Sequence, residues 1–249
     1  MRFAAIADVH GNHAALKAVL DDIARLGIRD IVNLGDCFSG PLEAGLCGDL
    51  LLLLDMAGAR TVRGNHDRYI LETPVDTMGI SDRHAHDQLS ARHFDWLRKL
   101  PLDMVFRDDV YLCHATPADD NLYWLETVTP EGAVTLRPQA EIEDLAQGIA
   151  QPLILCAHSH VARMVQLADG RLIVNPGSVG CPGYEDDLPY PHKVEVGHAL
   201  ACYAILDKTE RGWVPEFRCV AYDHMAMSRL AGANGRAEWA QALATGRVE

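Results

Sequence analysis

Residues 3–13 combine an apolar run, a polar loop and the start of a helical pattern, and they read Phe3-Ala4-Ala5-Ile6-Ala7-Asp8-Val9-His10-Gly11-Asn12-His13. The run at 3–7 predicts a buried strand. From His13 onward, apolar positions 16, 19, 20, 23 and 26 recur at helical spacing, and Gly27 stands where a helix C-cap belongs. Asn12 is the expected N-cap. This stretch therefore predicts a strand, a loop and a helix, with Asp8 and His10 in the loop.

Strand and helix signals continue to alternate through the first two thirds of the chain. Further strands are predicted at 31–34, 61–62, 110–113 and 153–157, and helices at 41–57 and 91–100. The last third predicts strands at 171–174, 199–206 and 214–222, then helix at 225–244 with a break near 232–235. This order indicates an α/β protein with a second, more antiparallel sheet, in a single domain over residues 1–249. The aperiodic segments 73–90 and 180–198 are expected to be long loops.

Composition narrows the class of protein. The 249 residues are 49% hydrophobic and 23% charged, as in ordinary globular proteins. The net charge of −13 argues against nucleic-acid binding, which needs a basic face, but not against a small phosphorylated substrate held by metal ions. No apolar run approaches the roughly 20 residues that span a bilayer, and no signal peptide is recognisable, so we expect no membrane association and a cytoplasmic location.

The cysteines also suit a cytoplasmic location. They are seven in number, at positions 37, 47, 113, 156, 181, 202 and 219, and no two form a C-x-x-C pair. This pattern argues against a disulfide framework and against a structural zinc site. Cys113, Cys156 and Cys202 lie in apolar runs and are expected to be small core residues.

Polar donors follow five of the predicted strands. They are Asp8 with His10, Asp36, Asn65, His114, and His158 with His160. Each is weak evidence alone, because alternate residues of a regular strand point to opposite faces and a single histidine is usually structural. Ligands in open α/β sheets bind beyond the carboxyl ends of strands, so these side chains are expected to meet. Seven oxygen and imidazole donors exceed the needs of one ion and suit two ions that share a carboxylate.

The five blocks Asp8-x-His10, Gly35-Asp36, Gly64-Asn65-His66-Asp67, His114 and His158-x-His160 occur in this order. Together they resemble the signature of the calcineurin-like metallophosphoesterases. The stretch Asn175-Pro176-Gly177-Ser178-Val179-Gly180 is similar to the small bacterial and archaeal phosphodiesterase branch. The resemblance covers about 170 residues. It implies a four-layer α/β/β/α sandwich of two mixed β-sheets flanked by helices.

The same resemblance implies a ligand set. One metal would be held by Asp8, His10, Asp36 and His160, and the other by Asp36, Asn65, His114 and His158. Asp36 would bridge them. The cofactors would be two divalent transition-metal ions, Mn²⁺ first, with Fe, Zn or Ni as alternatives. Cys113 stands before His114 where many members have glycine, which leaves open a thiol near the metals.

The implied reaction is in-line attack on a phosphate ester by a metal-bridging hydroxide, with His66 as general acid. The predicted catalytic residues are His66 and Asp67, and a carboxylate, Asp36 or Asp67, would position the His66 ring. Arg63 and His13 are the candidate substrate-binding residues, although Arg63 is equally suited to pairing with a surface carboxylate. Monoester and diester substrates both remain open.

Other features of the sequence allow alternative interpretations. His84 and His86 belong to the aperiodic segment 73–90, which is expected to be a solvated loop rather than a lid, and Tyr184 and His192 are candidates for shaping specificity. A protein Ser/Thr phosphatase shares the five blocks, but such enzymes are usually longer, so a small molecule or nucleotide is the favoured substrate. A non-catalytic binding module is disfavoured because all seven ligand positions and His66 are present. The oligomeric state is open.

Overall fold

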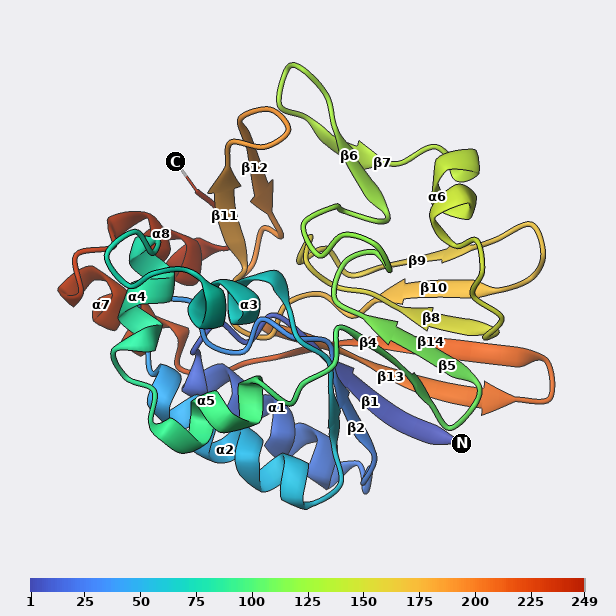
Figure 1. The fold of residues 1–249 in the computed structure, drawn as a ribbon, viewed down its shortest axis with the longest axis horizontal. Helices are drawn as coiled ribbons and strands as arrows, with labels where there is room; N and C mark the ends of the chain where they lie inside the picture. Colours follow the sequence, from blue (N-terminus) through green and yellow to red (C-terminus); the bar gives the residue numbers. More distant parts are fainter. Residues whose placement is uncertain (249) are drawn as a thin grey trace.

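The structure is a computed structural model, and it describes residues 1–248 (Figure 1). The first of its two large sheets has the strand order β14-β13-β1-β2-β3. Its strands are β1 (Arg2–Ile6), β2 (Ile31–Asn33), β3 (Arg60–Thr61), β13 (Ala201–Thr209) and β14 (Gly212–Val220). The first three run parallel, whereas β13 pairs antiparallel with both β1 and β14. The sheet is therefore mixed.

The second large sheet has the order β4-β5-β8-β10-β9. Its strands are β4 (Asp103–Phe106), β5 (Val110–Cys113), β8 (Leu153–Leu155), β9 (Arg163–Gln166) and β10 (Leu172–Asn175). The three central strands are parallel, and the edge strands β4 and β9 are antiparallel to their neighbours. This sheet is also mixed.

Alternation along β1 and β8 defines the layers. Phe3 and Ala5 pack in a core between the sheets, together with Leu153 and Leu155 of β8. Ile6, on the opposite face of β1, packs in a core that includes buried residues of the helices α1 (His13–Arg25), α2 (Ala44–Met56) and α5 (Ala91–Leu97). On the far side of the second sheet, buried residues of β8 and β10 pack against α6 (Gln139–Leu145). The predicted four-layer α/β/β/α sandwich is confirmed.

Shorter elements surround one end of the sandwich. They are α3 (Asn65–Glu72), α4 (Ile80–His86), the hairpin β6 (Glu126–Val128) with β7 (Val134–Leu136), the hairpin β11 (Gly183–Asp186) with β12 (His192–Glu195), α7 (His224–Ala233) and α8 (Ala237–Thr245). Figure 1 shows the two hairpins rising on the same side of the molecule, where α8 also lies. Among residues 1–248, no helix has the length and apolar character needed to cross a membrane.

Several sequence predictions need correction. The late strands β13 and β14 do not form the second sheet; they extend the first, because β13 pairs with β1 in the register Phe3↔Leu206. The segment 73–90 contains α4, which was missed because α4 buries only Asp82 and Ala85 and so shows no apolar stripe. The segment 180–198 contains the β11–β12 hairpin. The helices predicted at 41–57 and 91–100 are shorter, at 44–56 and 91–97.

Candidate metal centre

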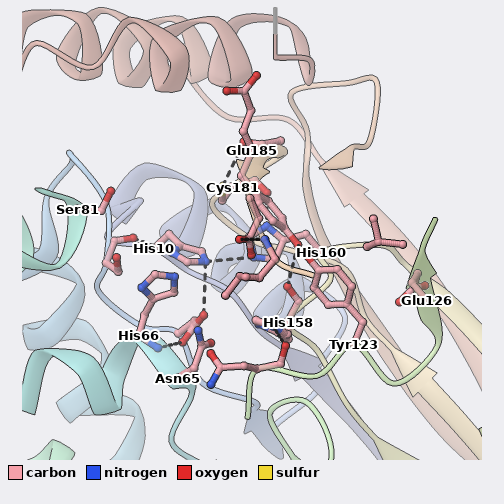
Figure 2. A pocket seen from close by; sticks show the side chains of 18 of the residues that line it. His10, Asn65, His66, Ser81, Tyr123, Glu126, His158, His160, Cys181 and Glu185 are labelled. Atoms are coloured by element: carbon pink, nitrogen blue, oxygen red, sulfur yellow. Dashed lines mark hydrogen bonds and ion pairs between the residues drawn. The ribbon is translucent and has the colours of Figure 1, made fainter. Parts of the chain in front are cut away.

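The predicted donors meet at the carboxyl ends of the central strands, where six of them form two groups. Asp8, His10 and His160 make up one group, and Asp36, His114 and His158 make up the other. Within each group the potential ligand atoms lie within 4.8 Å of one another. Figure 2 shows His10, His66, His158 and His160 around the same space, with Asn65 beside them.

Asp36, a member of the second group, also faces the first. Its Oδ2 is 3.8 Å from Nε2 of His10 and 3.3 Å from Nε2 of His114. Its other oxygen, Oδ1, accepts the backbone N–H of His66 at 3.0 Å. One carboxylate oxygen therefore faces both groups while the other is held by α3, as a bridging ligand requires.

The backbone explains how residues two apart in sequence reach one place. Five of the donors have positive φ angles: Asp8 (53°), His10 (50°), Asp36 (54°), His158 (70°) and His160 (60°). The only other non-glycine residues with positive φ between positions 1 and 248 are Arg107 and Asp108 in the β4–β5 turn. Such a conformation costs about 1–3 kcal/mol at each residue, so its concentration here marks a functional site.

Hydrogen bonds fix the tautomer of each histidine. The Nδ1–H groups of three rings donate to backbone carbonyls: His10 to Ser39 at 2.6 Å, His114 to Leu34 at 2.7 Å, and His160 to Cys181 at 2.8 Å. His158 has the opposite orientation and donates from Nε2 to the Asn121 carbonyl at 3.0 Å. Each ring therefore directs its other nitrogen away from the backbone, in the orientation that metal-binding histidines have.

Burial governs the protonation of this centre. It lowers the pKa of His10 to about 4 and that of His158 to about 3, which keeps both rings neutral. Burial also raises the pKa of Asp8 well above its usual value, with the charge of Asp36 adding to the effect. For His114, burial opposes protonation, but the charge of Asp36 outweighs it and raises the pKa to about 10.

Unpartnered polar atoms show that the residues present fit divalent cations. Both carboxylate oxygens of Asp8 and Oδ1 of Asn65 are buried, yet within the described part of the chain they have no hydrogen-bond partner. Buried oxygens without a partner are costly, and a native structure normally satisfies them. Carboxylate, amide and imidazole donors together suit divalent transition metals. Cys113 belongs to neither group, and its thiol donates to the Ala115 carbonyl at 3.4 Å.

His66 is positioned by a residue that the sequence did not indicate. Its Nδ1 lies 2.8 Å from Oδ1 of Asp82 on α4, so the prediction that Asp36 or Asp67 orients the ring is wrong. Burial disfavours the charged ring, but Asp36 and the hydrogen bond to Asp82 outweigh it and raise the pKa of His66 to about 9. Asp82 was not identified because it lies in the segment that lacked periodicity.

Asp67 has a different set of contacts from those predicted. Its buried carboxylate accepts the backbone N–H groups of Cys37, at 2.9 Å, and Gly64, at 3.2 Å. These bonds tie the loop after β2 to the start of α3. Burial, together with the charge of Asp36, raises the pKa of Asp67 to about 6.

The two predicted substrate-binding residues do not line the cavity above the centre. The backbone N–H of Arg63 donates to Pro101, and its Nε is buried without a hydrogen-bond partner. His13 lies 3.9 Å from Glu43, measured from Nδ1 to Oε2. Contact of either residue with substrate stays a prediction.

The cavity has a volume of about 940 Å³, and its floor includes His10, Asp36, Asn65, His66, His158 and His160. Aromatic walls come from Tyr69, Tyr123, Tyr184 and Trp239. The hydroxyl of Tyr123 lies 2.6 Å from that of Tyr184 and 3.0 Å from Nε2 of His192. Tyr184 and His192 were candidates for shaping specificity, whereas Tyr123 and Trp239 were missed because no local motif marks them.

A close approach of backbone to Asp36 explains the glycine at position 64. A Cβ on Gly64 would lie 2.2 Å from Oδ1 of Asp36 and 2.6 Å from its backbone nitrogen. We expect Gly64→Ala to displace Asp36, lower the free energy of unfolding by about 1–3 kcal/mol and weaken metal binding. Urea unfolding and metal analysis would measure both effects. In Gly232→Ala, the nearest atom to the added Cβ is 3.7 Å away, so this control should lose no stability. Unchanged unfolding of Gly64→Ala would contradict the close approach.

Comparisons with known proteins show which chains this one is similar to. Among curated proteins, the uncharacterized protein MJ0912 of Methanocaldococcus jannaschii is 26% identical over 201 residues, which are 72% of this chain and 76% of that protein. Among solved structures, a metallophosphoesterase from Sphaerobacter thermophilus is 26% identical with a TM-score of 0.74, covering 99% of this chain and 100% of that one. The hypothetical protein PH1004 of Pyrococcus horikoshii OT3 shares the fold, with 18% identity, a TM-score of 0.78, and coverage of 100% of this chain and 99% of that one.

The family assignment comes from a family model that matches most of the sequence. The model of the calcineurin-like phosphoesterase superfamily domain matches residues 1–191, which include every donor of both groups. The two solved structures also align with the remaining residues, so the likeness of fold extends through α7 and α8. The chain belongs to the calcineurin-like phosphoesterase superfamily.

Proposed function

We propose that the protein is a dinuclear metal-dependent phosphoesterase that hydrolyses a small phosphorylated molecule or a nucleotide in the cytoplasm. The observation that carries this proposal is the pair of donor groups on either side of a single Asp36 oxygen. Asp8, His10 and His160 with Asp36 would hold one ion, and Asn65, His114 and His158 with Asp36 would hold the other. Mn²⁺ is the first candidate, with Fe, Zn and Ni as alternatives.

Two bound divalent ions would supply positive charge to phosphate oxygens and lower the pKa of water. The protein supplies the proton for the leaving group. Because Nδ1 of His66 is engaged by Asp82, Nε2 is the nitrogen available to the ester, and His66 lines the cavity floor. A raised pKa keeps this ring protonated at neutral pH, which a general acid requires.

The cavity supports a small organic phosphate as substrate. Its volume is near the upper end of the ~300–1,000 Å³ typical of small-molecule sites, so a phosphate on the floor leaves room for an organic group. Tyr69, Tyr184 and Trp239 offer that group aromatic surface. The net charge of −13 disfavours a nucleic-acid substrate. A binding module without activity would have no need for the His66–Asp82 pair.

The test is metal removal and restoration. Chelation should abolish hydrolysis of both p-nitrophenyl phosphate and bis(p-nitrophenyl) phosphate, and Mn²⁺ should restore it. The ratio of the two restored rates would assign the enzyme as a phosphatase or a phosphodiesterase. Activity that survives complete chelation would contradict a metal-dependent mechanism. Absence of bound metal and of turnover with Mn²⁺, Ni²⁺, Zn²⁺ and Fe²⁺ would favour the binding module.

A further inference from the structure

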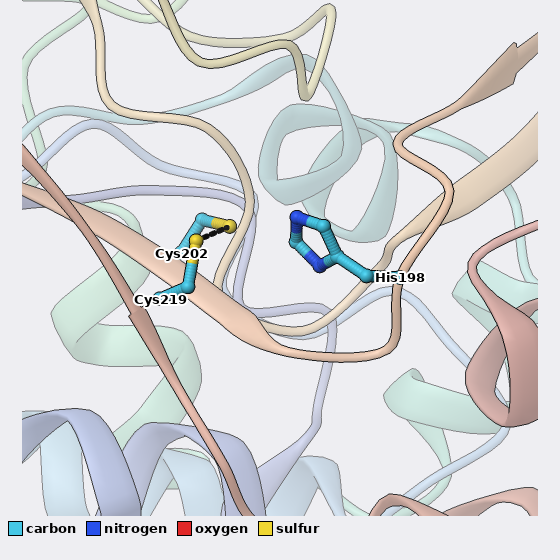
Figure 3. A group of neighbouring side chains, drawn as sticks. All are labelled: His198, Cys202 and Cys219. Atoms are coloured by element: carbon cyan, nitrogen blue, oxygen red, sulfur yellow. Dashed lines mark hydrogen bonds between the residues drawn. The ribbon is translucent and has the colours of Figure 1, made fainter.

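A third group of potential ligands lies apart from the candidate metal centre (Figure 3). The β13–β14 register places Cys202 directly opposite Cys219, and their sulfurs are 3.5 Å apart. His198, in the connection that leads into β13, completes the group, and the three ligand atoms lie within 4.8 Å of one another. Figure 3 shows the imidazole ring facing the two thiols. None of these residues belongs to the two groups around Asp36.

We propose that His198, Cys202 and Cys219 form an additional metal site for a thiophilic divalent ion, Zn²⁺ above all. In a tetrahedral zinc site with Zn–S bonds of about 2.3 Å and Zn–N bonds of about 2.0–2.1 Å, two sulfurs lie about 3.8 Å apart and sulfur and nitrogen about 3.6 Å apart. The observed sulfur separation of 3.5 Å is already close to this value. The fourth position is open to water, because Cys219 is exposed on the edge strand β14.

The donor set selects a different metal from the centre around Asp36. Thiolate ligands favour softer ions such as zinc, whereas the first two groups contain only carboxylate and imidazole donors. Burial raises the pKa of the Cys202 thiol, with the neighbouring Cys219 adding to the effect, so Cys202 carries a proton in the absence of metal. Cysteine ligates as the thiolate, so binding of one divalent ion would release thiol protons to solvent, and His198 would ligate as the neutral ring.

A metal ion would engage all three side chains of this group, whereas a disulfide would engage only the two cysteines. A disulfide would have to bring the sulfurs from 3.5 Å to about 2.05 Å, and it would leave His198 without a role. Nδ1 of His198 accepts the Leu200 N–H at 3.3 Å, a long hydrogen bond that the neutral ring would give up when either of its nitrogens ligates the metal. The absence of a C-x-x-C pair concealed this site from the sequence, because the two cysteines are 17 positions apart and meet only through strand pairing.

The site would act as a structural clamp. It would join the connection that contains His198 to the edge strand β14, and unprotected edge strands are weak points of a sheet. Two hydrogen bonds link it to the centre: the Cys202 N–H donates to the Ser178 carbonyl at 2.9 Å, and the Ser178 hydroxyl donates to the Asp8 carbonyl at 2.8 Å. Its ligands do not line the cavity, so the clamp supports the centre without contacting substrate.

Cobalt offers a direct test, because Co²⁺ bound to thiolate gives a charge-transfer absorption that carboxylate and imidazole ligands do not. With the protein reduced by a phosphine, Co²⁺ titration should produce this band with the intensity of one thiolate-bound ion per chain, and Zn²⁺ should remove it. Cys202→Ser and Cys219→Ser should abolish the band, and His198→Ala should weaken Co²⁺ affinity by at least about 10-fold. Cys219→Ser is the safer variant for folding, because Cys219 is exposed.

Two controls separate this site from the proposed function. Asp36→Asn should retain the cobalt–thiolate band even when it has lost all phosphoesterase activity. Cys47→Ala, which removes a buried thiol on α2, should also retain it. A missing band in the wild-type protein, or a band that persists in Cys219→Ser, would overturn the proposal. So would an intact mass two hydrogens lighter after purification with Zn²⁺, since it would show a disulfide between the two strands.

Discussion

Asp36→Asn is expected to lose both metal ions together and to lower kcat/KM by at least about 10³-fold. The Oδ2 atom of Asp36 faces both His10 and His114, so both ions would depend on its charge. Two catalytic ions supply several kcal/mol of transition-state stabilisation, and each 1.36 kcal/mol is tenfold in rate. The substitution isolates the charge, because an asparagine is the same size and its amide oxygen can still accept the His66 N–H.

The measurements are metal content per chain and hydrolysis of the preferred nitrophenyl ester at saturating Mn²⁺. Circular dichroism and urea unfolding would establish that the variant is folded, so that the loss is one of chemistry. The matched control is Asp55→Asn, which changes a solvent-exposed carboxylate on α2 and should keep both ions and full activity. Two tightly bound ions in Asp36→Asn would remove Asp36 from the bridging position.

The donor blocks after β1, β2 and β8 could be read from the sequence because these strands are buried on both faces. Buried parallel strands such as 153–155 are short apolar runs, and the residues after them lie at one edge of the sheet. What the sequence could not show is the conformation of those residues. Five donors adopt left-handed backbone, which non-glycine residues rarely adopt, and the modest preference of aspartate and histidine for it does not predict it at any one position. The surrounding packing enforces this conformation.

The unpredicted features all depend on contacts between distant segments. Asp82 reaches His66 because α3 and α4 pack together, yet α4 has too few buried apolar residues to reveal itself as a helix. The membership of β13 in the first sheet depends on its pairing with β1, while its local pattern suits either sheet. Trp239 enters the cavity from α8, near the far end of the chain. Local periodicity carries no information on such pairings.

His66→Ala is expected to lower kcat by about 10²–10⁴-fold for alkyl phosphate esters and by less than about 10-fold for p-nitrophenyl esters. An alkoxide leaving group needs a proton in the transition state, whereas p-nitrophenolate leaves without one. The comparison requires one alkyl and one aryl ester of the same charge, measured on wild type and variant. His86→Ala, on α4 but outside the cavity lining, is the matched control and should leave both rates unchanged. Equal slowing of the two esters would remove the general-acid role.

The pH profile gives a second readout of the same group. The acid is active when protonated, and the pKa of His66 is raised to about 9, so activity should be retained below that value and lost as the pH rises through it. Cations at Asp36 offset part of the charge that raises this pKa, so the basic limb should fall at or below pH 9. It should disappear in His66→Ala. A basic limb that persists unchanged in the variant would belong to another group.

The Asp82→Asn variant tests whether His66 needs the negative charge of Asp82 to act as the general acid. Asp82→Asn keeps a hydrogen-bond acceptor for Nδ1 of His66 but removes the negative charge that favours the protonated ring. We expect a loss of about 10-fold with alkyl esters and a basic limb shifted to lower pH. Because Asp82 is not among the candidate metal ligands, metal content should stay at two ions. In the His66→Ala background the same change should have no further effect, since groups that act through one another are not additive. An equal further loss in that background would mean that Asp82 contributes independently of the ring it contacts.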